Sequence, residues 1–106
     1  MSALRTPPPG FDAGRACALA DELERALHAL PAAADGIPAR KAALMTLRKQ
    51  LDGTRVAGGL PIVAVETVFG GRFVAYGLAC TSVRGFDGAL ANWIDRARTL
   101  AQEAAR

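Results

Sequence analysis

Apolar residues recur at intervals of three and four along two long segments of the chain, which is the period of a helix with one buried side. The first segment, residues 12–30, places its apolar side chains in a stripe about 100° wide and stops before Pro31. The second segment, residues 87–104, has the most regular helical period in the sequence. We therefore expect an amphipathic helix near each end of the chain. The stripes consist of Ala16, Leu19, Ala20, Leu23, Ala26, Leu27 and Leu30 in the first helix, and of Leu90, Trp93, Ile94, Ala97, Leu100, Ala101 and Ala104 in the second.

The segment 38–51 predicts a third helix between these two. Pro38 suits the first turn, because the N–H that proline lacks would have no helical partner there. Gly53 follows the last apolar position and can adopt the left-handed conformation that commonly ends a helix. The apolar side of this helix, an arc of about 60° on a helical wheel, consists of Leu44, Leu47 and Leu51.

Two strand-like runs, residues 61–69 and 72–81, meet at a Gly-Gly pair. Such a pair between apolar runs is typical of a two-residue hairpin turn, in which Phe69 would pair with Arg72. One face of this hairpin then carries bulky apolar side chains, and the other carries small ones toward its base. Because small side chains let a helix approach closely, we expect the C-terminal helix to pack on the second face.

The bulky face of the hairpin needs a cover of its own. Either the first two helices supply it, or a second copy of the chain does. The hairpin also has two open edges, and edge pairing across a two-fold axis would convert two hairpins into a four-stranded sheet. We expect a homodimer on these grounds. The expected self-association face comprises Val63, Val65, Phe69, Val74, Tyr76 and Leu78.

These patterns predict an α+β fold of order α-α-β-β-α, in which helices pack an antiparallel hairpin and a dimer completes the sheet. Residues 1–11 contain three consecutive prolines and predict an extended or frayed lead-in, and residues 12–106 predict a single domain. Hydrophobic residues make up 51% of the chain, which is enough for a small core and argues against disorder.

Basic residues are concentrated in the segment 38–51, although the chain as a whole is only mildly basic, with a formal net charge of +3 at pH 7. The segment contains four cations and no acid, whereas the segment 12–30 is net acidic. In a dimer, two such helices and the hairpin tip would form a cationic surface typical of contact with phosphate or another anionic partner. The alternative is a solvated face, or one that pairs with the acidic helix. The candidate contacts are Arg40, Lys41, Arg48, Lys49, Arg55, Arg72 and Arg84.

Catalytic chemistry has little support in the sequence. The glycine patterns of nucleotide-binding loops, the serine-hydrolase elbow and the HExxH zinc motif are absent. The single histidine, His28, is expected on the outer side of its helix, and both cysteines are expected to be buried structural residues. Glu66 is the one carboxylate within the hairpin, and we expect it to pair with Arg84 or Arg96. We therefore expect no catalytic residue, no cofactor and no bound metal.

The leading interpretation is a small non-catalytic binding module, an adaptor, regulator or inhibitor of a larger macromolecule, which forms a homodimer and binds a protein partner. One alternative is a dimeric nucleic-acid-binding protein that uses the basic helix 38–51 and the hairpin tip. Another is a small anionic ligand bound at a subunit interface near Arg72 and Arg84.

The sequence also bears on where the protein acts. The bias toward Ala, Arg and Gly is typical of a bacterial protein, and chains of this size are common among phage and plasmid accessory proteins. No stretch reaches the roughly 20 apolar residues of a membrane span, and the N-terminal segment lacks the pattern of a signal peptide. We expect a cytoplasmic protein with no membrane partner.

Overall fold

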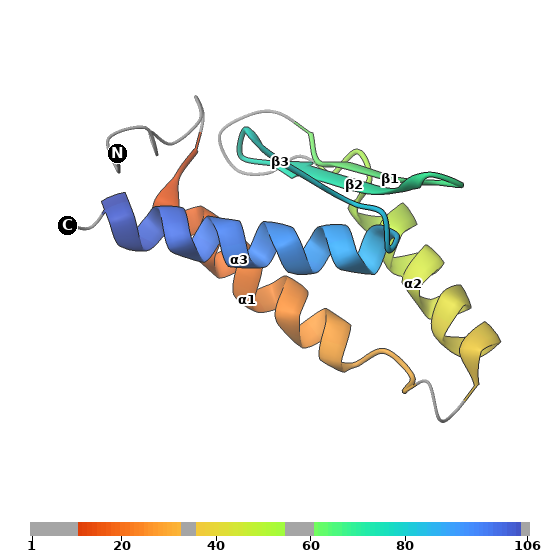
Figure 1. Ribbon diagram of the computed structural model, residues 1–106. Coiled ribbons are helices and arrows are strands. Elements are labelled where there is room, and N and C mark those ends of the chain that lie inside the picture. The colour runs from red at the N-terminus through yellow and green to blue at the C-terminus, as the bar shows by residue number, and fades with distance from the viewer. Residues whose placement is uncertain (1–10, 33–35, 55–60, 105–106) are drawn as a thin grey trace.

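The described residues form three helices and one antiparallel sheet, an α+β single domain (Figure 1). The computed structural model describes residues 11–32, 36–54 and 61–104. The α+β class is as the sequence predicts, but the sheet has three strands instead of two. In chain order, the elements are α1 (Ala13–His28), α2 (Ile37–Leu51), β1 (Val63–Thr67), β2 (Gly70–Ala75), β3 (Leu78–Ser82) and α3 (Phe86–Ala104).

The helices begin and end close to the predicted positions, for local chemical reasons. Asp12 is the N-cap of α1, and its side chain accepts a hydrogen bond of 2.9 Å from the backbone N–H of Arg15. The N-cap of α2 is Gly36, and Pro38 lies in its first turn. Gly53 has a φ of 83° just after α2, the left-handed conformation expected there. The predicted lead-in lies outside the described residues apart from Phe11, which packs partly against the core.

The predicted second strand, 72–81, is wrong in one respect, because a turn at Tyr76 and Gly77 divides it into β2 and β3. Both residues have positive φ angles, 52° and 78°. Positive φ at both central residues is the signature of a primed two-residue turn, whose twist matches the flanking strands. Tyrosine rarely adopts this conformation, so the sequence pattern gave no signal for the turn. The result is a meander of strand order β1-β2-β3.

The first hairpin turn is also not where the sequence places it. The turn residues are Val68 and Phe69, and the predicted pairing of Phe69 with Arg72 is replaced by a register in which Val65 pairs with Arg72. The glycine pair lies inside β2 instead. A Cβ atom on Gly71 would overlap the backbone of Phe86 at the start of α3. The glycine is therefore needed for close packing of α3 on the sheet, and not for the turn.

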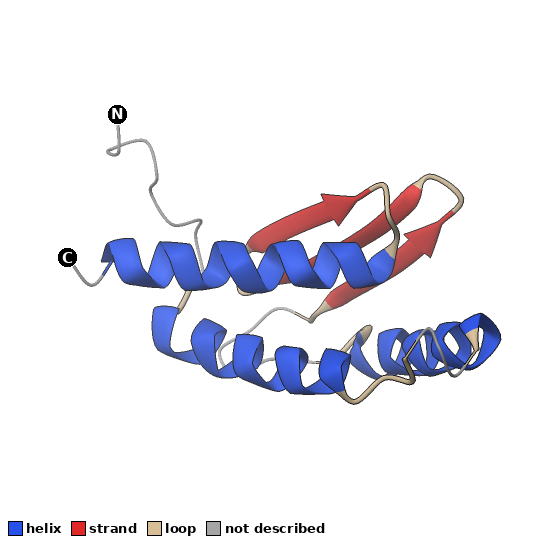
Figure 2. Cartoon of the chain, turned by 60° about the horizontal axis from the view of Figure 1, so that its bottom comes forward, coloured by secondary structure: helices blue, strands red, loops and turns tan. Residues whose placement is uncertain are grey.

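The elements form layers in which α3 lies between the sheet and α1 (Figures 1 and 2). The predicted packing of the C-terminal helix on the hairpin is confirmed, since the Trp93 ring meets the Phe73 ring edge to face with centroids 5.4 Å apart. The indole N–H of Trp93 lies 3.3 Å from the carbonyl oxygen of Ala75 and 3.1 Å from that of Leu78, so it can donate to both ends of the β2–β3 turn. Trp93 thus fixes the turn and fills the core at once.

The buried side of α3 is broad enough to serve two neighbours. Its buried residues cover an arc of roughly 140° on a helical wheel, wider than the stripe of an ordinary surface helix. The α1 stripe is rich in alanine, which lets the two helices approach closely. The core residues are Ala16, Ala20 and Leu23 in α1, Ile62 and Ala64 in and next to β1, Phe73, Ala75, Leu78 and Cys80 in β2 and β3, and Phe86, Ala89, Leu90, Trp93, Ile94, Ala97 and Leu100 in α3.

Replacing Gly71 with alanine should lower the free energy of unfolding by about 2 kcal/mol or more. The added methyl group would overlap the backbone of Phe86, so the sheet and α3 would have to separate. The matched control is Gly14→Ala in the exposed first turn of α1, where the nearest atom to a new Cβ is a carboxylate oxygen of Asp12 at 3.6 Å. That change should be neutral or stabilise by up to about 1 kcal/mol. Urea denaturation measures both, and equal effects would contradict the packing role of Gly71.

Candidate interaction surface

One face of the sheet packs on α3, and no helix of the described part of the chain lies on the other (Figure 2). We call this second side the open face. It carries three β-branched apolar side chains where an antiparallel sheet usually places polar ones. Val63 and Val65 have 37% and 38% of their surface exposed. The strand positions of the open face are Val63, Val65 and Thr67 of β1, Gly70, Arg72 and Val74 of β2, and Ala79 and Thr81 of β3.

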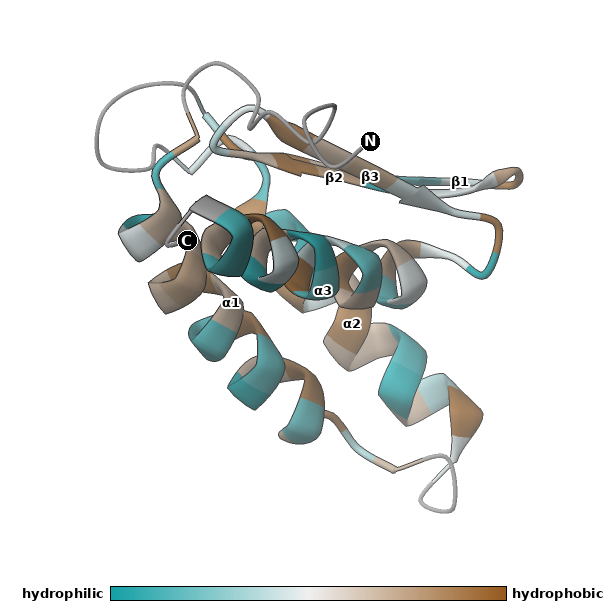
Figure 3. Cartoon of the chain, turned by 60° about the vertical axis from the view of Figure 1, so that its left-hand side comes forward, coloured by the Kyte–Doolittle hydropathy of each residue, from teal (hydrophilic) through white to brown (hydrophobic). Residues whose placement is uncertain are grey.

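The apolar surface continues beyond one end of the sheet, where the β1–β2 turn and the β3–α3 loop lie together (Figure 3). Val68, Phe69 and Val83 are 93%, 87% and 91% exposed there, and we call these three residues the tip cluster. Phe69 and Val83 line a hollow of about 330 Å³ with Val65 and Arg72 of the open face. Contiguous exposed apolar patches of this kind typically mark interaction sites.

The predicted self-association residues divide between this surface and the core. Val63, Val65 and Val74 lie on the open face, and Phe69 lies in the tip cluster. Leu78 is instead a core residue with 4% exposure, and Tyr76 lies half-buried in the turn. The reason is the unpredicted β2–β3 turn. It interrupts the alternation of side chains between the two faces of the sheet, so that Leu78 of β3 lies on the same face as its partner Ala75 and points toward α3. The open face therefore extends onto β3 through Ala79 and Thr81.

The outer edge of β1 is covered by side chains from the end of α2. The guanidinium of Arg48 donates to the carbonyl oxygen of Ala64 at 3.1 Å, and the carboxylate of Asp52 accepts from its N–H at 2.9 Å. Both backbone groups of Ile62 are also hydrogen-bonded, one to Gly53 and one to Thr54. Another strand could not pair with this part of β1 without displacing these bonds. The predicted completion of the sheet across a dimer stays a prediction, and this part of the edge is already occupied.

The basic residues predicted to contact an anionic partner are dispersed. Arg48 binds the β1 edge, and Arg40 donates to the carbonyl oxygen of Pro31 at 3.1 Å. Lys41 and Lys49 are exposed on α2, whereas Arg55 lies outside the described residues. Two of the four cations of the helix thus already have partners within the chain.

The two remaining candidates, Arg72 and Arg84, line different cavities. Arg72 belongs to the hollow of the open face, and Arg84 lines a cleft of about 510 Å³ between α1, α2 and α3. That cleft contains cations and acids together, so it has no strong preference for an anion. Its charged lining residues are Glu24, Arg40, Arg84, Asp87, Asp95 and Arg98.

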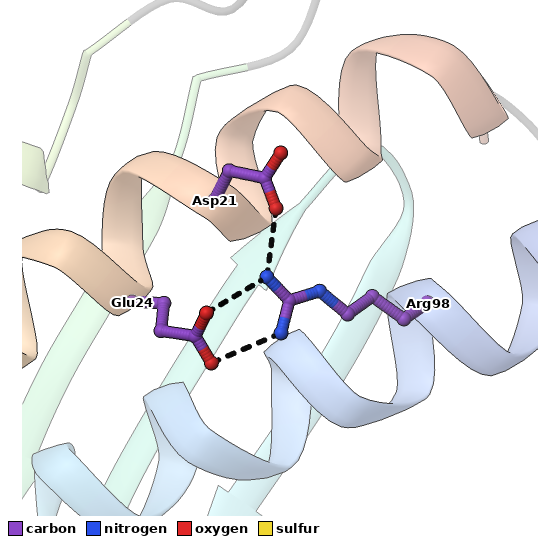
Figure 4. A network of polar contacts seen from close by, with 3 residues as sticks. All are labelled: Asp21, Glu24 and Arg98. Carbon is purple, nitrogen blue, oxygen red and sulfur yellow. Dashed lines mark hydrogen bonds and ion pairs between the residues drawn. The ribbon is translucent and has the colours of Figure 1, made fainter.

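A three-residue ion-pair network closes one side of this cleft (Figure 4). The Arg98 guanidinium donates two hydrogen bonds to Glu24, at 3.0 and 3.1 Å, and one to Asp21 at 2.7 Å. Hydrogen bonding and charge from Arg98 hold the pKa of the Glu24 carboxyl below its ordinary value. The network therefore favours the folded state at neutral pH, and this contribution is lost as the pH falls and Glu24 becomes protonated. Its role is to join α1 to α3.

Glu66 has a structural partner that sequence reasoning missed. Its Oε1 atom accepts a hydrogen bond of 2.9 Å from the backbone N–H of Phe86, the first residue of α3. The expected pairing with Arg84 or Arg96 is not what the structure shows. The Glu66 carboxylate, from a strand distant in sequence, therefore caps the N-terminus of α3. The positive end of the helix dipole attracts a negative charge at this position. Only the tertiary packing brings the two residues together, so no local signal announces the contact.

The groups that could support catalysis are separated. Cys80 is buried in the core, and burial raises the pKa of its thiol, which favours the unreactive neutral form. His28 lines the helical cleft instead. Within the described residues, no group of three or more His, Cys, Asp or Glu side chains is arranged to hold a metal ion. None of the helices described has the combination of length and apolarity that crossing a bilayer requires.

Comparison of the chain with protein-family models, with curated proteins and with solved structures finds no match. The interpretation of the open face therefore rests on its own residues. Its defining features are an apolar sheet face on which no described helix packs, the tip cluster, and Arg72, the one cation at the described strand positions of this face.

Replacing Arg48 with methionine should lower the free energy of unfolding by about 1 to 2 kcal/mol, because a charged donor to the Ala64 carbonyl is lost. Lys49→Met at the next, exposed position is the matched control and should change stability by less than about 0.5 kcal/mol. Chemical denaturation of both variants gives the comparison. Equal stabilities would mean that Arg48 is free for another role, such as contact with an anionic partner.

Proposed function

We propose that this protein is a small non-catalytic binding module that docks a protein partner on its open face and tip cluster. The observation that carries the proposal is the exposure of Val68, Phe69 and Val83 beside a sheet face of partly exposed valines that no described helix covers. Large apolar side chains are seldom this exposed together in a soluble domain unless another molecule covers them. The docked partner would remove this surface from water, which is the main favourable term in most protein association.

The rigidity of the surrounding structure supports this use of the surface. The strands that carry the open face are fixed from behind by α3, through the close approach at Gly71 and the hydrogen bonds of Trp93. A surface that is already ordered loses little conformational entropy when a partner binds. Phe69 at the tip has an aromatic side chain of a type that is enriched at the core of protein interfaces.

The polar groups elsewhere in the molecule support a binding role over a catalytic one. Arg40 and Arg48 are hydrogen-bonded within the chain, and Arg98 is held by two carboxylates. The Cys80 thiol is favoured in its neutral form by burial. These groups stabilise the fold, so we propose an adaptor, regulator or inhibitor of a larger macromolecule, of the kind that bacterial mobile elements encode, acting in the cytoplasm.

The alternative within this proposal is self-association, in which the open face binds a second copy of the chain. A second copy could cover the open face and give the homodimer that the sequence predicts. A dimer would have a mass of about 22 kDa, twice the 11.0 kDa of the chain. Such a dimer would form through the apolar residues of the open face. Pairing along the outer edge of β1 is less favourable, because Arg48 and Asp52 already bind the backbone of Ala64 there.

Site-specific photo-crosslinking in the producing cells tests the proposal. A photoreactive phenylalanine derivative at Val65 should give a discrete covalent adduct larger than the 11.0 kDa chain after irradiation. The matched control is the same derivative at Ala18, an exposed position of α1, the helix that α3 separates from the sheet. It should give no discrete adduct, because it lies outside the proposed surface.

The pattern of adducts decides between the outcomes. An adduct that contains another protein and depends on the Val65 position supports a partner on the open face. One that contains only this chain, near 22 kDa, supports the homodimer. The absence of any adduct at Val65, or the same adducts at Val65 and Ala18, would contradict a binding role for the open face.

A further inference from the structure

Within the residues that the structure describes, Arg72 is the only charged side chain at a strand position of the open face. It lies in the central strand, where the register places it between Val65 of β1 and Thr81 of β3. The other strand positions on this side are valine, threonine, alanine and glycine. A cation in the middle of an uncovered apolar face provides no packing for the core behind the sheet.

The surroundings of Arg72 lack a counter-charge. It lines the hollow of about 330 Å³ together with Phe69 and Val83 of the tip cluster. None of the described residues forms an ion pair or hydrogen bond with its side chain, whereas Arg48 and Arg98 are both bonded within the chain. The donors of its guanidinium are therefore not taken up within the described part of the chain, and a molecule that covers the hollow could accept hydrogen bonds from them.

We propose that the open face binds a segment of another protein that presents an acidic side chain between apolar ones, and that Arg72 pairs with this acid. The inference rests on the proposed function and deepens it by naming the chemistry of the partner. A guanidinium binds a carboxylate through two parallel hydrogen bonds, which fixes the register of the segment as well as adding affinity. Apolar side chains on either side of the acid would contact the tip cluster and the valines, and would exclude water from the pair.

A second copy of the chain fits this surface less well than another protein does. Two open faces packed against each other would bury both Arg72 guanidinium groups against strand positions that carry no acid. A buried charge without a counter-charge strongly opposes association. A nucleic acid would also be a poor occupant, because it is bound by several cations together and the strands of the open face offer one.

A displayed library of random linear twelve-residue peptides, selected on the immobilised full chain, provides the test. Selection on the wild type should enrich peptides with Asp or Glu flanked by apolar residues. Selection on Arg72→Glu should enrich Lys or Arg at the corresponding position, because the charge of the anchor is reversed. This exchange of preference would not follow from a merely structural role of Arg72.

Affinity measurements on one peptide enriched by the wild type complete the experiment. Its binding should weaken about tenfold or more with Arg72→Glu, and should be unchanged with Arg84→Glu, which makes the same charge change in the helical cleft. Val65→Lys should weaken it as well, since it places a charge on the apolar face. Circular dichroism of each variant confirms that it is folded.

Four results would overturn the inference. If binding of the selected peptides is weakened by Val65→Lys but the peptides show no preference for Asp or Glu, the open face is a binding site and Arg72 has no role in it. Peptides whose binding ignores both substitutions, or a lack of any enrichment, would remove the proposed function together with the inference. A mass near 22 kDa that Val65→Lys reduces to 11 kDa, without peptide binding, would assign the face to a second copy.

Discussion

The close contact between α3 and one face of the sheet is the constraint on which the rest of the structure depends. It requires a glycine at position 71, where a side chain would overlap the backbone of Phe86, and it is fixed by Trp93, which can donate to two carbonyl groups of the β2–β3 turn. Glu66 adds a cap to the start of the same helix. With α3 on this face, α1 packs on the far side of α3, where the alanines of both helices allow a close approach.

The distribution of helices then decides what remains exposed. With α1 behind α3 and α2 holding the β1 edge through Arg48 and Asp52, no described helix covers the second face of the sheet. That face nevertheless carries valines, and its end carries the tip cluster. In a sheet with one face exposed to solvent, the residues of that face are usually polar and alternate with apolar residues on the buried face. The fold of the chain does not by itself explain the chemistry of the open face, and the docking of a partner that we propose accounts for it.

The sequence predicts those parts of the fold that depend on local pattern. The helices follow from the spacing of their apolar residues, and the packing of α3 on the small-residue face follows from alternation in the strands. The turn at Tyr76 could not be predicted, because it depends on a tyrosine in a conformation that tyrosine rarely adopts. The glycine pair was assigned to the turn, since its use in close helix packing depends on a segment far away in the chain.

The candidate site also contains residues that the sequence predicts and residues that only the tertiary structure places there. Val63, Val65 and Phe69 were predictable as an apolar surface from alternation alone, whereas Leu78 changed sides with the missed turn. The sequence of α2 shows a cluster of basic residues, but it does not indicate that Arg48 binds the β1 edge. The acceptor is the backbone carbonyl of Ala64, which only the tertiary fold brings close to Arg48.

The most direct test of the open face is NMR of the valine methyl groups in the presence of a soluble paramagnetic agent, over a range of protein concentrations. For the 11.0 kDa chain alone, we expect strong relaxation of the Val65, Val68 and Val83 methyls, and protection of buried methyls such as those of Ile62 and Leu90, recorded in the same way. This result at every concentration would establish an apolar face that is free to receive another protein. Protection of Val65 even at the lowest concentration would show that the face is already covered, and would contradict the account.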